Sequence, residues 1–208
     1  MRTMTVEYNI YKYNELSEEA KEAVKEWYLE NQEPYFFTEM CKEDLYCLFG
    51  KNNLDVQYSL ASCQGDGLNI YGKINAKDII NCLNNHNGGA EFKEFEDVLT
   101  EDEKKIILAY AEDCGEVKLP MNNRYCYSLA DYIDIVEDWT WELENADYTD
   151  INEEALNKFE KLVREMFGKL CRTYEKWGYD YFYEVSEEDL EEACEANEWE
   201  FLENGMIF

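Results

Sequence analysis

Apolar and polar residues alternate on both sides of a glycine-rich segment in the first half of the chain. The apolar positions before it are Leu54, Val56, Tyr58 and Leu60, and those after it are Leu68, Ile70, Gly72 and Ile74. A period of two is typical of strands with one buried face. Between the runs, Gly65 and Gly67 flank Asp66 and supply the positive φ angles that a tight turn needs. We therefore predict an antiparallel hairpin from Leu54 to Ile74.

The turn of this hairpin has a second interpretation. Backbone N–H groups of Gln64–Gly67 would be able to hold a ligand, as glycine-rich loops do. No lysine follows in the position that a phosphate-binding loop requires, which favours the plain turn.

Helical periodicity and capping signals predict helices that cover the hairpin. Ser17 is a good N-cap, and the apolar residues after it suggest a helix that packs one face on the sheet. Thr100 and Glu103 form a capping-box pattern for a helix that stops near Gly115. Further helices are predicted at Thr38–Phe49, after Asn75, from about Glu153 to Trp177 with Gly178 closing it, and after Ser186.

Shorter alternating runs predict additional strands. These are Val6 to Lys12 as a first strand of the central sheet, one or two strands over Tyr125–Tyr127 and Tyr132–Val136, and a short C-terminal hairpin turning at Asn204-Gly205. The expected fold is α+β: a mostly antiparallel sheet built around the central hairpin and packed with several helices, one of them long and in the C-terminal half. No linker or repeat interrupts the chain, so we expect a single domain over residues 1–208.

The charge restricts the possible partners. The 208 residues include 48 acidic and 19 basic residues, a net charge of −29, whereas 46% hydrophobic and 15% aromatic content is typical of a folded protein. Such a field repels nucleic acid and anionic membranes and favours a partner with a basic surface. No apolar run spans a membrane, no signal peptide is evident, and the eight cysteines form no Cys-x-x-Cys pair. We expect free thiols and a cytoplasmic protein.

Sequence motifs for catalysis are missing. His86 is the single histidine, in a loop rich in Asn and Gly, and we expect it to be a solvated loop residue. Phosphate-loop, dinucleotide, nucleophile-elbow and zinc-protease motifs do not occur. We therefore expect a protein that is not an enzyme and has no cofactor or metal. A metal-dependent enzyme with clustered carboxylates stays open as an alternative.

Acidic residues concentrate in the C-terminal part, residues 131–208. Ten carboxylates fall between Asp131 and Glu154 and eleven between Asp180 and Glu203, with no Lys or Arg in either stretch. Solvated helix faces usually mix both signs at i and i+4, so this pattern is unusual. On the last predicted helix, six acids within about 15 Å give one charge per roughly 2.5 Å, close to the one per about 1.7 Å of duplex DNA. Imitation of DNA and mere solubility are the two interpretations.

Two groups of carboxylates are therefore the candidate partner-binding residues. The first group is Glu187, Glu188, Asp189, Glu191, Glu192, Glu195, Glu198 and Glu200, and the second is Asp131, Asp134, Glu137, Asp138, Glu142 and Glu144. Trp139 and Trp141 are candidates either for apolar anchors of an interface or for core packing.

Three motifs resemble a group of acidic proteins from bacteriophages and prophages. They are Glu15–Ala23 (ELSEEAKEA), Ser59–Gly67 (SLASCQGDG) and Ala196–Phe201 (ANEWEF), which together span nearly the whole chain. The resemblance implies a phage origin and a role inside the infected bacterium. Acidic phage proteins of this size include anti-restriction and anti-CRISPR proteins, several of which imitate DNA. The resemblance brings no residue of known function.

The leading hypothesis is a phage-encoded inhibitor of a bacterial defence nuclease, an anti-CRISPR protein above all. It would bind the basic nucleic-acid channel of a CRISPR RNA-guided nuclease as a DNA mimic, in the host cytoplasm and without touching nucleic acid. The alternative, beside the enzyme above, is an acidic antitoxin-like protein that neutralises another basic partner.

Overall fold

The computed structural model describes residue 2, residue 4 and residues 7–208. The chain divides into two compact units, one formed by residues up to 34 together with 177–208 and the other by residues 35–176. Each unit has its own core and is described by itself. Whether the two units unfold together, as the predicted single domain over residues 1–208 requires, stays a prediction.

A three-stranded antiparallel sheet lies at the centre of the unit formed by residues 35–176. Its strands β1 (Asn53–Ser59), β2 (Gly67–Asn75) and β3 (Glu116–Leu119) stand in the order β1-β2-β3. Val56 pairs with Ile70, and both are buried. Gly72 pairs with Leu54 on one side and Leu119 on the other, and a Cβ there would lie 2.2 Å from the carbonyl oxygen of Asn53. The predicted hairpin is confirmed.

Helices surround the sheet of this unit. They are α2 (Pro34–Phe49), α3 (Ala76–Asn84), α4 (Gly89–Phe92), α5 (Glu101–Cys114), α6 (Ile135–Asn145) and α7 (Glu153–Tyr183), with 3-10 turns η2 (Lys93–Phe95) and η3 (Ala130–Tyr132). Pro34 of α2 and residues 177–183 of α7 are counted with the other unit. The predicted caps are confirmed. Asn75 Oδ1 accepts the N–H of Lys77 at 2.8 Å, and Thr100 and Glu103 form the reciprocal capping box.

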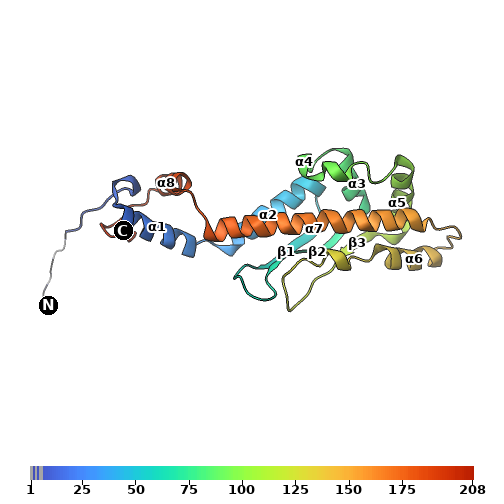
Figure 1. The fold of residues 1–208 in the computed structure, drawn as a ribbon, viewed down its shortest axis with the longest axis horizontal. Coiled ribbons are helices and arrows are strands. Elements are labelled where there is room, and N and C mark those ends of the chain that lie inside the picture. The colour runs from blue at the N-terminus through green and yellow to red at the C-terminus, as the bar shows by residue number, and fades with distance from the viewer. Residues whose placement is uncertain (1, 3, 5–6) are drawn as a thin grey trace. The chain divides into compact units, whose positions relative to one another are not determined.

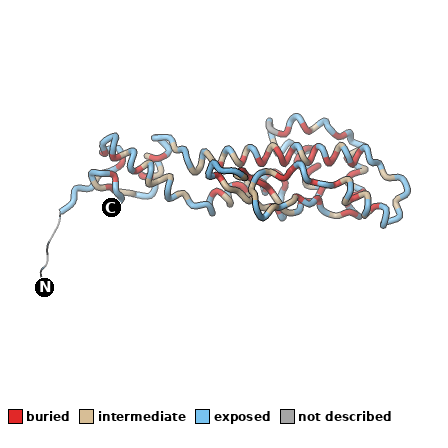
Figure 2. Tube along the Cα trace, turned by 60° about the horizontal axis from the view of Figure 1, so that its bottom comes forward, coloured by how far each residue is buried: buried red, intermediate tan, exposed pale blue. Residues whose placement is uncertain are grey.

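Helix α7 packs on the sheet and supplies much of the core (Figure 1). Its buried side chains repeat at three- and four-residue spacing: Leu156, Phe159, Leu162, Val163, Met166, Phe167, Leu170, Cys171 and Tyr174. Figure 2 shows buried positions recurring along the long helix. Phe167 stacks on Phe49 of α2 with ring centroids 5.5 Å apart, and Phe159 contacts Trp139 of α6 at 5.9 Å. The predicted long helix and its core role are confirmed.

Two helix boundaries differ from the prediction. α7 continues past Gly178 to Tyr183, because Gly178 is not among the glycines with positive φ and so does not form an αL cap. α2 begins at Pro34 instead of Thr38, since proline fits the first helical turn, where its missing N–H leaves no bond unmade. Met40 of α2 is exposed although it is apolar.

Two predicted strands in residues 120–136 are wrong. Tyr125–Tyr127 lies in a loop beside the hairpin turn, where the ring of Tyr125 packs against Gly65 and the backbone of Tyr127 lies against Gly67. The Cys126 N–H donates to the Gly65 carbonyl at 3.1 Å. The run Tyr132–Val136 contains the last residue of η3 and the start of α6. There the helical spacing of Ile135, Trp139 and Leu143, all buried, outweighs a five-residue alternation.

The other unit contains α1 (Glu18–Glu30), α8 (Glu187–Ala196), the 3-10 turn η1 (Tyr13–Glu15) and the C-terminal segment. Ser17 caps α1 as predicted, its Oγ accepting the Ala20 N–H at 3.3 Å. The inward face of α1 joins a small separate core: Tyr13, Leu16, Ala20, Val24, Leu190, Cys194 and Phe201. The prediction that α1 packs on the sheet is therefore wrong, because an amphipathic pattern indicates a buried face without naming its neighbour.

The predicted N-terminal strand of the sheet is also wrong where it can be checked. Residues 5–6 lie outside the described residues, and residues 7–10 form no strand. Tyr11 instead forms an isolated antiparallel bridge with Phe201, with N–O distances of 2.8 and 2.9 Å. Phe201 also bridges to Ile207 around Gly205, which confirms the C-terminal hairpin in the form of a single bridge.

Candidate functional site

Helix α8 is fixed by a cap at its first turn and by two buried side chains. Ser186 Oγ accepts the N–H of Asp189 at 3.0 Å and donates to its carboxylate at 2.6 Å. The acids of the first turn face the positive end of the helix dipole, which favours them. Leu190 and Cys194 point into the core of the unit. The opposite side of α8 is therefore presented outward.

That outward side is formed by Glu188, Glu191, Glu192 and Glu195, which we call the acidic face of α8. Their spacing of i, i+3, i+4 and i+7 places them on one side of the helix. Glu191 is half-buried and the other three are exposed. Within the described part of the chain none of the four side chains has a salt-bridge partner. Each pair of like charges at these spacings destabilises a helix by about 0.2–0.5 kcal/mol, so the acidic face destabilises α8.

Other predicted carboxylates of this group have partners within the unit. Glu187 binds the ammonium of Lys21 on α1 at 2.8 Å, and this hydrogen bond lowers the pKa of Glu187 below its ordinary value. Glu200 lies 3.3 Å from Lys12. Asp189 is engaged with the Ser186 cap. Since their charges are used inside the molecule, these three contribute less to an outward field. Glu198, at the end of α8, is exposed and has positive φ.

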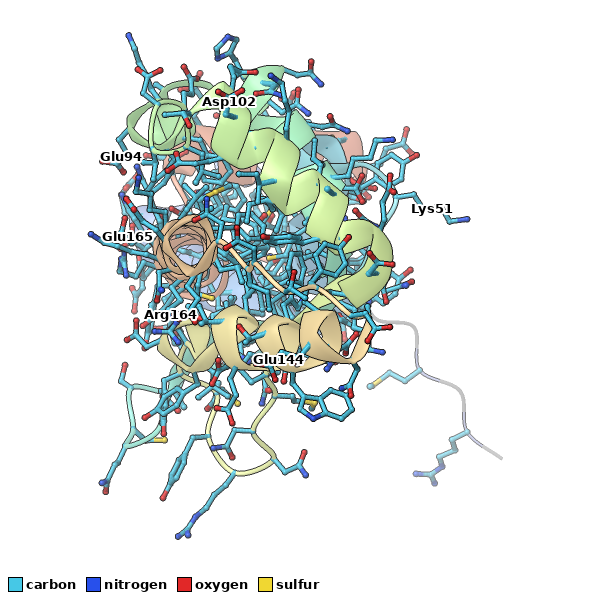
Figure 3. The ribbon with its side chains drawn as sticks, turned by 90° about the vertical axis from the view of Figure 1, so that its right-hand side faces the viewer. Lys51, Glu94, Asp102, Glu144, Arg164 and Glu165 are labelled. Atoms are coloured by element: carbon cyan, nitrogen blue, oxygen red, sulfur yellow. The ribbon has the colours of Figure 1, made fainter. Side chains whose placement is uncertain are left out.

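The second group of carboxylates lies on and before α6, in the unit of residues 35–176. Asp134 is the N-cap, accepting the Glu137 N–H at 3.1 Å, and Asp138 pairs with Lys118 of β3 at 2.9 Å. The remaining members, Asp131, Glu137, Glu142 and Glu144, are exposed or half-buried. Figure 3 shows Glu144 on α6. The two groups thus belong to different units, and each is a candidate surface by itself.

The two tryptophans of α6 have different environments. Trp139 is 2% exposed and packs in the core, whereas Trp141 is 68% exposed. Trp141 lies four residues after Glu137 and three before Glu144, so it shares a face with both. The anchor interpretation therefore remains for Trp141 alone, and Trp139 is a core residue.

Sequence reasoning missed the cations that neutralise part of the acid. Lys21, Lys12 and Lys118 pair with Glu187, Glu200 and Asp138 from other elements, separated by up to 188 residues along the chain. Local spacing holds no signal of such pairs. It also missed Glu160 of α7, a buried carboxylate that accepts the N–H groups of Ile135 and Val136, both at 2.8 Å. These bonds hold the first turn of α6.

The described residues show no arrangement typical of a metal site or of a membrane-spanning helix. His86 is exposed, as predicted, with Nδ1 2.6 Å from a carboxylate oxygen of Glu96. Over residue 2, residue 4 and residues 7–208, no three His, Cys, Asp or Glu side chains converge as a metal site would require. None of the described helices has an apolar stretch long enough to cross a bilayer. No described cysteine is in a disulfide, and five of the eight are buried.

No protein-family model matches the chain, and no curated protein or solved structure matches it.

Proposed function

We propose that the chain is an inhibitor, encoded by a bacteriophage, of a bacterial defence nuclease. It acts in the host cytoplasm by occupying the basic nucleic-acid channel of that enzyme, and a CRISPR RNA-guided nuclease is the first target to test. The observation that supports this proposal is the acidic face of α8: four carboxylates on one side of a helix, without a cationic partner among the described residues.

The acidic face of α8 has no cationic partner of its own, so its binding free energy is most favourable with a surface of Lys and Arg that are not already paired with anions. A nucleic-acid channel is lined with Lys and Arg that neutralise phosphates, and an RNA-guided nuclease holds its heteroduplex in such a channel. Binding of the acidic face would release the like-charge repulsion along α8 and the counterions of the channel. It would also accelerate association by long-range attraction. The proposal needs no catalytic group, cofactor or metal.

The decisive experiment reverses the acidic face and compares it with a matched control. The test variant carries Glu188→Lys, Glu191→Lys, Glu192→Lys and Glu195→Lys. The control carries the same change at four exposed glutamates on one side of α1, in the same unit: Glu19, Glu22, Glu26 and Glu30. Both variants change the net charge by the same amount, so a difference between them reports the location of the charge.

Inhibition is measured as DNA cleavage by purified RNA-guided nucleases, with circular dichroism to verify that each variant is folded. We expect the wild type and the α1 variant to inhibit at low salt, the α8 variant to be inactive, and inhibition to weaken steeply with salt. A pull-down from bacterial lysate, with competing duplex DNA, extends the search to other nucleases. Equal loss of inhibition in the two variants would assign the effect to net charge, and full inhibition by the α8 variant would reject the acidic face as the binding surface. If no nuclease is bound or inhibited, the proposal fails.

A further inference from the structure

A cavity of about 240 Å³ opens beside the acidic face of α8, within the unit formed by α1, α8 and the chain termini. Its lining residues include Tyr13, Trp199, Glu191, Glu195, Glu198 and Lys12. Sites for small molecules usually have about 300–1,000 Å³, so this one fits a single long side chain better than a nucleotide or cofactor.

The end of α8 builds the wall of this cavity. The Trp199 N–H donates to the Cys194 carbonyl at 3.0 Å and the Glu198 N–H to the Glu195 carbonyl at 3.1 Å. This pair of bonds is the Schellman ending of a helix, in which Glu198 takes the left-handed position with φ of 55°. The indole of Trp199 is held edge-on by Trp27, with centroids 5.1 Å apart. The aromatic wall is therefore in place before any ligand arrives.

The charges around the cavity favour a cation. Glu191, Glu195 and Glu198 have no salt-bridge partner in the part of the chain that the structure describes, and Lys12, the one cation of the lining, lies 3.3 Å from Glu200. Burial, and then the neighbouring charge of Glu191, raise the pKa of the Cys194 thiol to about 11, so this side chain stays neutral. The lining therefore combines aromatic residues with glutamates that have no salt-bridge partner among the described residues.

We propose that this cavity receives one arginine side chain of the basic partner, an inference that rests on the proposed function. A guanidinium stacks on an aromatic ring while its N–H groups bind carboxylates at the edge, which is the combination that the cavity presents. The acidic face supplies long-range attraction, and the cavity supplies the anchor point where affinity concentrates.

The probe is the peptide acetyl-Gly-Gly-Arg-Gly-Gly-amide, and its control replaces arginine by citrulline, which keeps the shape and removes the charge. Binding is followed at about 0.15 M salt by the indole N–H resonance of Trp199 in ¹⁵N-labelled full-length protein, assigned with a Trp199→Phe variant. We expect a saturable shift with the arginine peptide and at least tenfold weaker binding of the citrulline peptide.

Two double variants, each lacking two exposed charges of the α8 region, distinguish the cavity from the field. Glu195→Gln with Glu198→Gln removes carboxylates of the cavity, and should weaken arginine binding at least tenfold. Glu188→Gln with Glu192→Gln removes two carboxylates that do not line the cavity, and should weaken binding less than threefold, because neither can bind the guanidinium directly. Lys12→Gln should bind the peptide more tightly than the wild type.

Equal losses in the two double variants, or an unmoved Trp199 resonance with the wild type, would overturn the cavity proposal. The nuclease assay is independent of this result. Inhibition that needs the acidic face, without a Trp199 shift, would leave the inhibitor proposal standing and remove the arginine site. A Trp199 shift without any nuclease bound would do the reverse.

Discussion

Removal of the Glu160 carboxylate should destabilise the unit that contains the sheet. We expect the loss to exceed that caused by removing any other charged side chain of α7. Glu160 is nearly buried, and one of its oxygens accepts the N–H groups of Ile135 and Val136, each at 2.8 Å. Its other oxygen lies 2.8 Å from the guanidinium of Arg164, which also donates to the carbonyl of Ile133 at 2.7 Å. One side chain therefore joins α7 to the first turn of α6.

The magnitude follows from what Glu160→Ala leaves behind. The buried N–H of Ile135 loses its acceptor, which costs about 2 kcal/mol, and the half-buried N–H of Val136 about 1 kcal/mol. The ion pair with Arg164, whose side chain is 35% exposed, adds about 0.5 kcal/mol after screening by solvent. We expect a total of about 3–4 kcal/mol for Glu160→Ala. Glu160→Gln keeps one acceptor oxygen and should cost about 1–2 kcal/mol.

The assay is urea unfolding at 25 °C, with Glu165→Ala as the control on the same helix. Glu165 is the exposed neighbour of Arg164 (Figure 3), and its only described ion pair, with Lys161 at 3.8 Å, is on the surface. It should therefore change the free energy of unfolding by less than about 0.5 kcal/mol. A loss below about 1 kcal/mol for Glu160→Ala, or equal losses for the two variants, would refute the role assigned to this carboxylate.

Three further predictions concern stability. The hydrogen bond from the Lys158 ammonium, and then those from Thr100, lower the pKa of Glu103 to about 2. The ionised Glu103 therefore stabilises the folded protein fully above pH 4.5, and this contribution disappears as the pH falls to 2. The difference in melting temperature between wild type and Glu103→Gln should vanish over that range, and a constant difference would contradict the prediction. Trp139→Ala should cost about 3–5 kcal/mol in urea unfolding and Trp141→Ala less than about 0.5 kcal/mol, and similar values would reject the assigned burial. Asp147→Gly should stabilise the protein by about 1 kcal/mol, because Asp147 has a φ of 63° after α6 and glycine adopts this left-handed conformation more easily. A lower melting temperature of the variant would count against this prediction.

Local signals in the sequence predicted what is determined locally. The hairpin was predictable because its alternation continues over seven or more residues on both sides of glycines that the turn requires. The caps Ser17, Asn75, Thr100 and Ser186 were predictable because each acts within three residues. The long stripe of α7 spans so many turns that no strand pattern competes with it.

What failed depended on contacts between distant residues. Tyr125 and Tyr127 lie against two glycines of the hairpin turn, Tyr125 through its ring and Tyr127 through its backbone, and their alternation resembles a strand in the sequence. The face of α1 is apolar as predicted, but its neighbours come from the other end of the chain. In the candidate site, the helix and its one-sided charge were predictable. The pairing of Glu187 with Lys21 and the position of Trp199 beside the carboxylates were not, since neither depends on local spacing.

At Glu198, after the end of α8, the residue that suits the backbone differs from the residue that supplies the surface charge. Glycine is the residue that the left-handed position of Glu198 prefers, and either glutamate codon becomes a glycine codon by one nucleotide change. A population of genes selected for thermal stability alone should therefore drift to glycine at this position. A population that must also keep a bound partner should retain the carboxylate, so the frequencies of the two codons after parallel selections would report whether this turn is maintained for the fold or for recognition.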